Sequence, residues 1–165
     1  MNDIEFSKEI RGAIKSNDTN RLVSLLESDK SRLNMVTPFG TWLHVAARAG
    51  NLEAVKRLVE MGADINKRGG TFDAGPLNIA VSYGQYEIVR YLLSSGAELD
   101  VSEPYRNPLF GAIYHGDLAI AKMLVEHGID WHMKYSGETM KDTDAISYAR
   151  ELGQLDITAY LESIN

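Results

Sequence analysis

One pattern governs what this chain can fold into: a phrase of about 33 residues that returns along its length. The stretch 40–66, GTWLHVAARAGNLEAVKRLVEMGADIN, is echoed by GPLNIAVSYGQYEIVRYLLSSGAELD from residue 75 and by NPLFGAIYHGDLAIAKMLVEHGID from residue 107. Each copy contains two helical segments of about ten residues, which are too short to be stable alone. Repeats of this length bury their apolar faces by stacking on neighbouring copies. The sequence therefore predicts an all-α solenoid of helix-turn-helix units.

Matched columns extend the repeat over the whole chain. Five copies align when they begin at Lys8, Thr41, Gly75, Asn107 and Asp144, with spacings of 33, 34, 32 and 37 residues. At the fifth offset every copy has an alanine, which lets a neighbouring helix approach closely: Ala13, Ala46, Ala80, Ala112 and Ala149. At the ninth offset stand Asn17, Gly50, Gly84, Gly116 and Gly153. The columns predict repeats at about 5–36, 37–70, 71–102, 103–135 and 140–165, within a single domain spanning residues 1–165.

Helix start and stop signals agree with this alignment. The first helix of a copy can be capped by Thr41, Asn107 or Asp144, and Pro76 and Pro108 suit its first turn. The residue at the ninth offset is expected to end that helix in a left-handed turn, which glycine and asparagine tolerate best. The second helix has cap candidates in Asp18, Asn51 and Asp117, and glycines at 62, 96 and 128 end it.

The repeated phrase resembles the ankyrin repeat, whose pattern is T-P-L-H-x-A, then A-x-x-G, a leucine pair and G-A-D-x-N. The matching residues here are Thr41, Leu43, His44, Ala46, Ala47, Gly50, Leu58, Gly62, Ala63, Asp64 and Asn66. The resemblance covers essentially the whole chain and is strongest from residue 40 to residue 130. It implies L-shaped repeats whose β-hairpin-like finger loops project beside a concave face lined by the first helices. The motif is specific for fold and nearly silent on function.

Departures from the pattern indicate how the array ends. The segment 8–34 is charged and lacks the glycines of the repeat pattern, as expected of an N-terminal capping repeat. The segment 144–165 is interpreted as the C-terminal cap. In that cap Arg150, Thr158 and Glu162 stand where apolar residues would face a further repeat. Trp42 replaces the usual proline, and hairpin packing and partner contact are equally open for it. Trp131 is expected in the core between repeats, and the segment 133–143 is expected to form a longer finger.

Composition narrows the class of protein. The 165 residues are 44% hydrophobic and 24% charged, which is ordinary for a soluble chain. The formal net charge of −6 argues against binding nucleic acid or an anionic membrane surface. There is no cysteine, no secretory signal pattern and no run of about eighteen apolar residues. We therefore expect a cytoplasmic protein without a membrane span.

Residues with catalytic or metal-binding chemistry do not assemble into a recognisable motif. His44 occupies the T-P-L-H column, where its ring is expected to bond Thr41 or the backbone. His127 and His132 are five residues apart, whereas metal ligands on one helix face are spaced by three or four. Nucleophile triads, H-E-x-x-H and a phosphate-binding glycine loop are absent from the sequence. The sequence thus predicts a protein that is not an enzyme, with no catalytic, metal or cofactor site.

A partner-binding surface follows from the ankyrin resemblance. In that family the concave face is lined by the seventh and eighth offsets of each repeat and by the finger residues before it. Tyrosine and arginine are enriched at binding hot spots. The predicted partner-binding residues are Arg48, Phe72, Asp73, Ser82, Tyr83, Glu103, Tyr105, Arg106, Tyr114, His115 and Glu151. The alternative for the finger aromatics, Phe39 and Phe72 above all, is that they pack on one another.

Charge is uneven along the chain. Residues 107–165 hold four basic and nine acidic side chains. An acidic end speeds encounter with a basic partner, although a solvated capping surface accounts for it equally well.

Two functions fit this pattern. One is an inhibitor, such as an immunity or antitoxin protein that covers the active site of a basic bacterial toxin or effector. The other is an adaptor or scaffold that recruits a signalling protein whose activity survives binding. In both cases the chain is expected to bind a protein partner and to be a monomer when free.

Overall fold

The computed structural model describes every residue from Met1 to Asn165. The chain is all α-helical, and its contacts divide it into two compact units, unit 1 (Met1–Ala97) and unit 2 (Glu98–Asn165). Unit 1 contains α1 (Asp3–Lys15), α2 (Thr19–Ser28), the short 3-10 helix η1 (Lys30–Arg32), α3 (Trp42–Ala49), α4 (Leu52–Glu60), α5 (Pro76–Ser82) and α6 (Tyr86–Ser94). Unit 2 contains α7 (Pro108–His115), α8 (Leu118–Glu126), α9 (Ala145–Glu151) and α10 (Leu155–Ser163).

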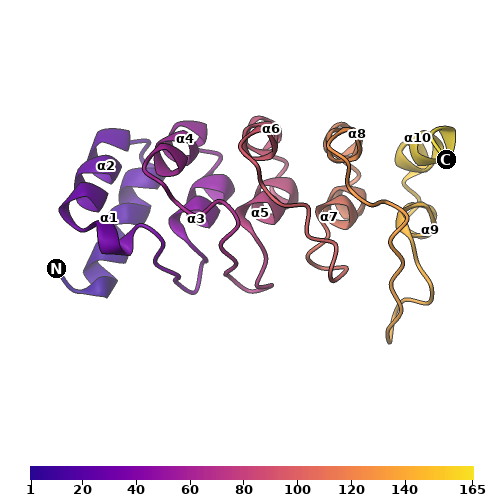
Figure 1. Cartoon of the computed structure of the whole chain (residues 1–165), viewed down its shortest axis with the longest axis horizontal. Coiled ribbons are helices and arrows are strands. Elements are labelled where there is room, and N and C mark those ends of the chain that lie inside the picture. Colours follow the sequence, from indigo (N-terminus) through magenta and orange to yellow (C-terminus); the bar gives the residue numbers. More distant parts are fainter. The chain divides into compact units, whose positions relative to one another are not determined.

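The helices of unit 1 form two rows, as Figure 1 shows. Helix α3 packs between α1 and α5 in what we call the inner row, and α4 packs between α2 and α6 in the outer row. The alanines at the fifth offset, Ala13, Ala46 and Ala80, are all buried, so inner helices meet without a bulky side chain between them. This confirms the predicted stacking of helix pairs as the source of the core.

Unit 2 repeats the arrangement with two helix pairs. Helix α7 packs against α9, and α8 packs against α10. Ala112 and Ala149 are fully buried and occupy the same inner-helix position as the alanines of unit 1. The prediction that all five repeats form one domain over residues 1–165 stays a prediction.

The predicted caps of the second helices and the left-handed turns that precede these helices are confirmed. The second helices are capped by Asp18, Asn51 and Asp117, and the side chain of each accepts a backbone N–H three residues later at 2.9–3.0 Å. Asn17 has a left-handed backbone with φ of 56°, and so do the four glycines that share its column. The chain therefore reverses at the same place in every copy, because the residue there accepts a conformation that other side chains resist.

The first helix is longer than the repeat alignment indicates. Helix α1 begins at Asp3, five residues before the aligned start at Lys8. Asn2 caps it by accepting the Glu5 N–H at 2.9 Å, and the Glu5 carboxylate accepts the Asn2 N–H at 3.3 Å. This reciprocal pair is a capping box, which extends the inner helix of the N-terminal copy by more than one turn.

Four loops between the helix pairs form the fingers. Finger 1 (35–40) is closed by a bridge between Thr37 and Gly40, and finger 2 (68–74) by a bridge between Gly69 and Ala74. Finger 3 (101–106) is a turn in which the Arg106 N–H donates to the Glu103 carbonyl at 3.0 Å. Finger 4 (133–143) is closed by a bridge between Tyr135 and Thr143, and it is the longer finger that the sequence predicts.

The two tryptophans differ from each other in burial. Trp42 is fully buried, its Nε1 donates to the Arg32 carbonyl at 2.8 Å, and its ring lies 6.2 Å from that of Phe6. The open question for this residue is thereby decided in favour of packing. Trp131 is only partly buried and lies against His132, so the expectation of a core position for it is wrong.

In the C-terminal cap, one of the three residues expected to face solvent is buried. The hydroxyl of Thr158 donates to the Gln154 carbonyl at 2.9 Å, which satisfies the hydroxyl and allows the side chain to be buried in α10. Arg150 and Glu162 are exposed and form an ion pair with each other.

Candidate protein-binding surfaces

The one buried histidine is a structural residue. His44 is fully buried, its Nδ1 accepts the Thr41 N–H at 3.1 Å, and its Nε2 lies 2.8 Å from the Ala74 carbonyl oxygen. A carbonyl can only accept, so Nε2 carries the proton and the ring is neutral. Burial lowers the pKa of His44, and the charge of Arg48 lowers it further, although the hydrogen bond that the ring donates to the Ala74 carbonyl raises it. The expected bonds to Thr41 and backbone are confirmed.

The unit 1 surface, as we call it, consists of Arg48, Phe72, Asp73, Ser82 and Tyr83. All five side chains are exposed, with Phe72 at 62% and Tyr83 at 52%. Arg48 lies in the last turn of α3 and Tyr83 directly follows α5. Because α3 packs on α5, the guanidinium carbon of Arg48 comes to lie 5.5 Å from the centre of the Tyr83 ring.

The Arg48–Tyr83 pair holds a cation over an aromatic face in the free chain. Arg48 takes part in none of the ion pairs of unit 1, so its charge is not neutralised by a carboxylate. Cation–π contact of this kind orders both side chains while leaving the outer edges of the ring and guanidinium open. The pair is therefore set up to receive a planar or anionic group of a partner.

The tip of finger 2 adds an aromatic side chain to unit 1. Phe72 stands next to Asp73, whose backbone is left-handed with φ of 46°, and the Gly69 N–H donates to the Ala74 carbonyl at the base of the finger. The sequence left open whether Phe39 and Phe72 pack on each other. Phe39 instead contacts the Arg11 guanidinium, 4.9 Å from its ring centre, and Phe72 stays exposed.

The remaining six predicted residues form the unit 2 surface: Glu103, Tyr105, Arg106, Tyr114, His115 and Glu151. In finger 3 the Arg106 guanidinium lies 5.3 Å from the Tyr105 ring centre, and its Nη1 donates to the Ser102 hydroxyl at 3.3 Å. At the end of α7 the Tyr114 ring, 63% exposed, meets the His115 ring edge-on at 5.2 Å. Glu151 is exposed in the last residue of α9.

Three aromatic rings of unit 2 pack on one another. Phe110 stacks on Tyr148 with ring centres 4.6 Å apart, and the Tyr135 ring meets Phe110 edge-on at 5.0 Å. Burial raises the pKa of Tyr148, and the neighbouring Tyr114 and Glu151 raise it further.

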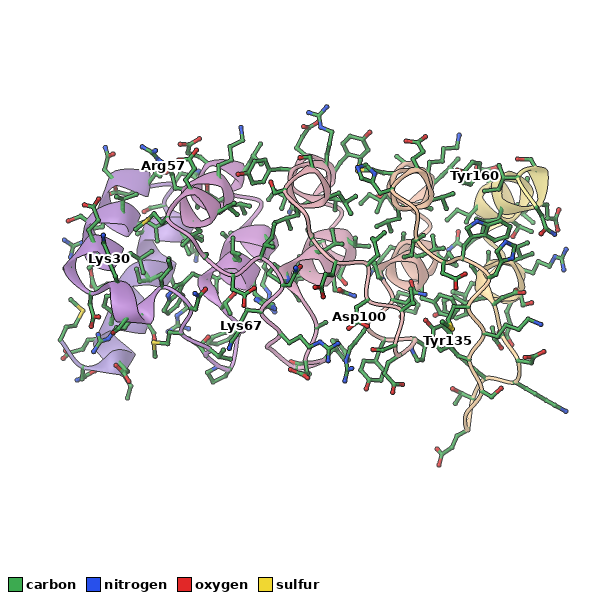
Figure 2. All side chains as sticks on the ribbon, in the orientation of Figure 1. Lys30, Arg57, Lys67, Asp100, Tyr135 and Tyr160 are labelled. Carbon is green, nitrogen blue, oxygen red and sulfur yellow. The ribbon has the colours of Figure 1, made fainter.

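Tyr135 links fingers 3 and 4, and Figure 2 labels it at the finger side of unit 2. Its hydroxyl accepts from the Asn107 side-chain amide at 3.0 Å and donates to the Val101 carbonyl at 2.7 Å. Burial is the main cause that raises the pKa of Tyr135. The two bonds fix finger 3, and with it Tyr105 and Arg106, relative to the base of finger 4.

The structure thus distributes the eleven predicted residues over two surfaces. It brings together Arg48 with Tyr83, Tyr105 with Arg106, and Tyr114 with His115. The assignment of the eleven residues to partner binding stays a prediction. Three further finger residues that the family pattern places at the concave face, Gly40, Ala74 and Thr143, are buried and offer no contact surface.

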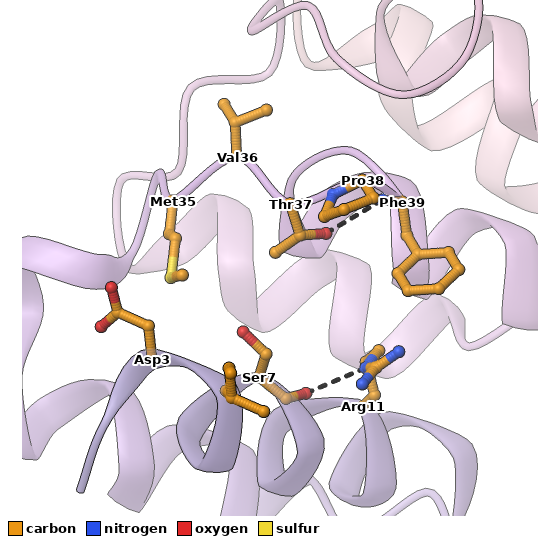
Figure 3. Close-up of a pocket in the computed structure, with 9 residues that line it drawn as sticks. Asp3, Ser7, Arg11, Met35, Val36, Thr37, Pro38 and Phe39 are labelled. Atoms are coloured by element: carbon orange, nitrogen blue, oxygen red, sulfur yellow. Dashed lines mark hydrogen bonds between the residues drawn. The ribbon is translucent and has the colours of Figure 1, made fainter.

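Sequence reasoning missed one exposed apolar region. Ile4 is 81% exposed on α1 and is one of the residues that line a pocket of about 320 Å³. Figure 3 shows this pocket between α1 and finger 1. The repeat alignment begins at Lys8, so it gave no position to the residues before it. The available signal was the helical spacing of Ile4, Lys8 and Arg11, which places an isoleucine on a face with two basic residues.

The structure contains no helix of the length and apolarity that crossing a lipid bilayer requires. No three His, Asp or Glu side chains lie close enough together to hold a metal ion.

Comparison with known proteins identifies a matching family and several relatives. The family model for ankyrin repeats (3 copies) matches residues 10–103 and 75–135. Protein phosphatase 1 regulatory subunit 27 of Mus musculus is 40% identical over 102 residues, which is 61% of this chain and 63% of that protein. The Homo sapiens protein of the same name is 40% identical over 104 residues, with the same shares covered. The chain therefore spans less than two thirds of the length of these relatives.

A third relative shows the repeat inside a much larger protein. The transient receptor potential cation channel subfamily A member 1 homolog of Caenorhabditis elegans is 30% identical over 130 residues, which is 78% of this chain and 11% of the channel homolog. Because proteins of such different size match the same repeats, the similarity indicates a fold and does not indicate an activity. From the family model and the structure together, the chain belongs to the ankyrin-repeat family.

Proposed function

We propose that the chain is a non-catalytic interaction module that regulates another protein by binding it through the unit 1 and unit 2 surfaces. The observation that carries the proposal is the Arg48–Tyr83 pair, in which an unneutralised cation is ordered over a half-exposed ring. Tyrosine and arginine supply most of the energy at many protein interfaces, and an ordered pair loses little side-chain entropy on binding.

An adaptor or regulatory role is the form that we favour. Two relatives are named as regulatory subunits of protein phosphatase 1. The catalytic subunit of protein phosphatase 1 is accordingly the first defined partner to test. In this form the chain recruits or redirects an enzyme and leaves its active site working.

An inhibitor or immunity function is the second candidate, and the charge of unit 2 favours it. Residues 98–165 hold five Lys or Arg against twelve Asp or Glu, a formal net charge of −7. Such a field steers association with a strongly basic protein, of which a secreted nuclease toxin is an example. In this form the partner loses its activity when bound.

Affinity capture with three forms of the chain tests the proposal. The forms are wild type, an Arg48→Ala/Tyr83→Ala variant, and a control Glu87→Ala/Arg90→Ala variant that removes an exposed ion pair on α6. We expect a protein that wild type and the control retain and that the first variant releases. Assay of that protein's activity with the chain bound then separates recruitment from inhibition.

A matching variant tests unit 2. Replacing Tyr105 and Tyr114 by alanine removes two rings of the unit 2 surface that are 52% and 63% exposed. Loss of the same partner would indicate that both surfaces contribute to one interface. A partner retained equally by all four forms contradicts the proposal, since binding would then use neither surface.

A further inference from the structure

A second docking surface lies in unit 1 between α1 and finger 1, and Figure 3 shows its two sides. Asp3, Ile4, Ser7 and Arg11 line it from the helix, and the five residues from Met35 to Phe39 line it from the finger. The pocket holds about 320 Å³. It contains none of the residues of the unit 1 surface, and it is therefore a separate site on the same unit.

The pocket is apolar where a side chain would enter. Ile4 is 81% exposed, Val36 49% and Phe39 43%, although side chains of this kind are usually buried. An exposed apolar hollow of this size accommodates a single aliphatic side chain of a partner, such as leucine. Removing these surfaces from water supplies a driving force for that entry.

Three basic residues lie on the face of α1 that carries Ile4, and one of them, Arg11, lines the pocket. Ile4, Ser7, Lys8, Arg11 and Lys15 share one face of α1, because their spacing returns them to the same side of the helix. Lys8, Arg11 and Lys15 take part in none of the ion pairs of the chain. Asp3, the acidic residue that lines the pocket, is paired with Arg32 at 2.9 Å, and Glu9 of the same helix is paired with Arg21 at 3.1 Å.

Arg11 is held in place for recognition. Its Nε donates to the Ser7 carbonyl at 3.1 Å, and its guanidinium lies 4.9 Å from the Phe39 ring centre. These contacts fix the plane of the guanidinium at the mouth of the pocket and leave its terminal nitrogens without a carboxylate partner. A fixed guanidinium binds a carboxylate through two parallel hydrogen bonds.

We infer that this pocket binds an extended acidic peptide of a partner protein that carries one aliphatic side chain. The aliphatic side chain enters between Ile4, Val36 and Phe39, a neighbouring carboxylate bonds Arg11, and further acidic groups lie along Lys8 and Lys15. The inference rests on the proposed function, because it assumes a protein partner. It adds the chemical class of the segment that this part of unit 1 selects.

Four defined peptides test the inference by fluorescence anisotropy at low salt. The probe is labelled Ser-Asp-Asp-Leu-Asp-Asp-Ser, and the matched peptides replace its leucine by alanine, its aspartates by asparagines, or its aspartates by lysines. We expect the probe to bind about tenfold more tightly than the alanine peptide, from the apolar contact. The asparagine peptide should bind several-fold more weakly than the probe and the lysine peptide should not bind. Equal binding of the four, or of none, overturns the inference.

Variants of the chain locate the binding. Arg11→Gln should weaken the probe about threefold or more, while its effect on the asparagine peptide stays small, because only the carboxylate contact is lost. Ile4→Ser should weaken the leucine probe and leave the alanine peptide unchanged. The control is Arg21→Gln, which removes a cation that is paired with Glu9 and lies outside the pocket. An equal loss with Arg21→Gln would show nonspecific charge attraction and overturn the assignment.

The Arg48→Ala/Tyr83→Ala variant separates this inference from the proposed function. It should bind the probe as wild type does, since neither residue lines the pocket. If the probe fails to bind while a captured partner still depends on Arg48 and Tyr83, the inference is wrong and the proposed function stands. If the probe binds and no captured partner depends on Arg48 and Tyr83, the inference stands and the proposed function is wrong.

Discussion

The neutral ring of His44 connects the start of α3 to the end of finger 2, because its Nε2 donates to the carbonyl of Ala74 at 2.8 Å. Thirty residues separate the two in the sequence. Replacing His44 by alanine leaves the Ala74 carbonyl and the Thr41 N–H without partners in a buried place. We expect the free energy of unfolding of unit 1 to fall by about 3 kcal/mol. Urea unfolding followed by Trp42 fluorescence in a Trp131→Phe background measures it.

Acid should weaken unit 1 through the same residue. The pKa of His44 in the folded chain is lowered from 6.5 by burial, so the unfolded chain binds the proton more readily. Stability is therefore full above about pH 6.5 and falls as the pH drops below that value towards the folded pKa. Urea titrations at several pH values should show this fall in wild type. The His44→Ala variant should lose that part of the dependence, and an unchanged slope in the variant would assign the acid effect to other groups.

Asn51 should contribute more to the stability of unit 1 than an ordinary helix cap does. Its Oδ1 accepts the Ala54 N–H at 2.9 Å, and its Nδ2 donates to the Ile14 carbonyl at 2.8 Å, across to the preceding helix pair. Asn51→Ala should lower the free energy of unfolding of unit 1 by about 2–3 kcal/mol, because the cap is lost and the Ile14 carbonyl is left unpaired. Asp18→Ala is the matched control, because the side chain of Asp18 caps α2 without a second bond and should cost about 1 kcal/mol. Equal losses would show that the bond to Ile14 adds nothing.

Two glycines of unit 1 should respond to alanine in opposite directions. A Cβ on Gly69 would lie 3.1 Å from the Gly40 Cα in the neighbouring finger, so Gly69→Ala should lower stability by about 1–2 kcal/mol. A Cβ on Gly12, inside α1, meets nothing within 4 Å. Gly12→Ala should therefore raise stability by about 0.5–1 kcal/mol, because alanine restricts the unfolded chain and favours helix. Thermal unfolding followed by circular dichroism detects both shifts, and a stabilising Gly69→Ala would refute the close contact.

The hydroxyl of Tyr135 should contribute far more to the stability of unit 2 than the hydroxyl of Tyr148. Tyr135→Phe leaves the Asn107 amide and the Val101 carbonyl unpaired and should destabilise unit 2 by about 1–3 kcal/mol. Tyr148→Phe keeps the ring that stacks on Phe110 and should change little. Hydrogen exchange of the amides of α7 and α9 measures the difference. Similar protection in the two variants would mean that the ring of Tyr135, not its hydroxyl, fixes finger 3.

Local chemistry explains which parts of the fold could be predicted from sequence. Asn17, His44 and Asp117 each have a role that depends on residues a few positions away or on the repeat pattern, and the structure confirms all three. The burial of Trp42 depends on Arg32 and Phe6, which belong to the capping repeat and to no shared column. The pattern therefore had no means of deciding it.

The candidate surfaces were predictable as a list of residues but not as a geometry. The seventh and eighth offsets place Arg48 and Tyr83 on exposed helix ends, yet their contact depends on how α3 packs on α5. The pocket beside Ile4 was missed for a related reason, since it needs the extra turn of α1 and the bend of finger 1 together. Neither feature is part of the repeat phrase.

The closed base of finger 4 has a consequence for engineering. The Tyr135 and Thr143 backbones exchange hydrogen bonds at 3.0 and 2.9 Å, so the seven residues 136–142 form a loop that is closed at its base. A foreign loop inserted between these two positions would be held at both ends by the paired backbones of Tyr135 and Thr143. This finger is therefore the natural graft site in the chain for displaying a chosen peptide while the helix pairs keep their register.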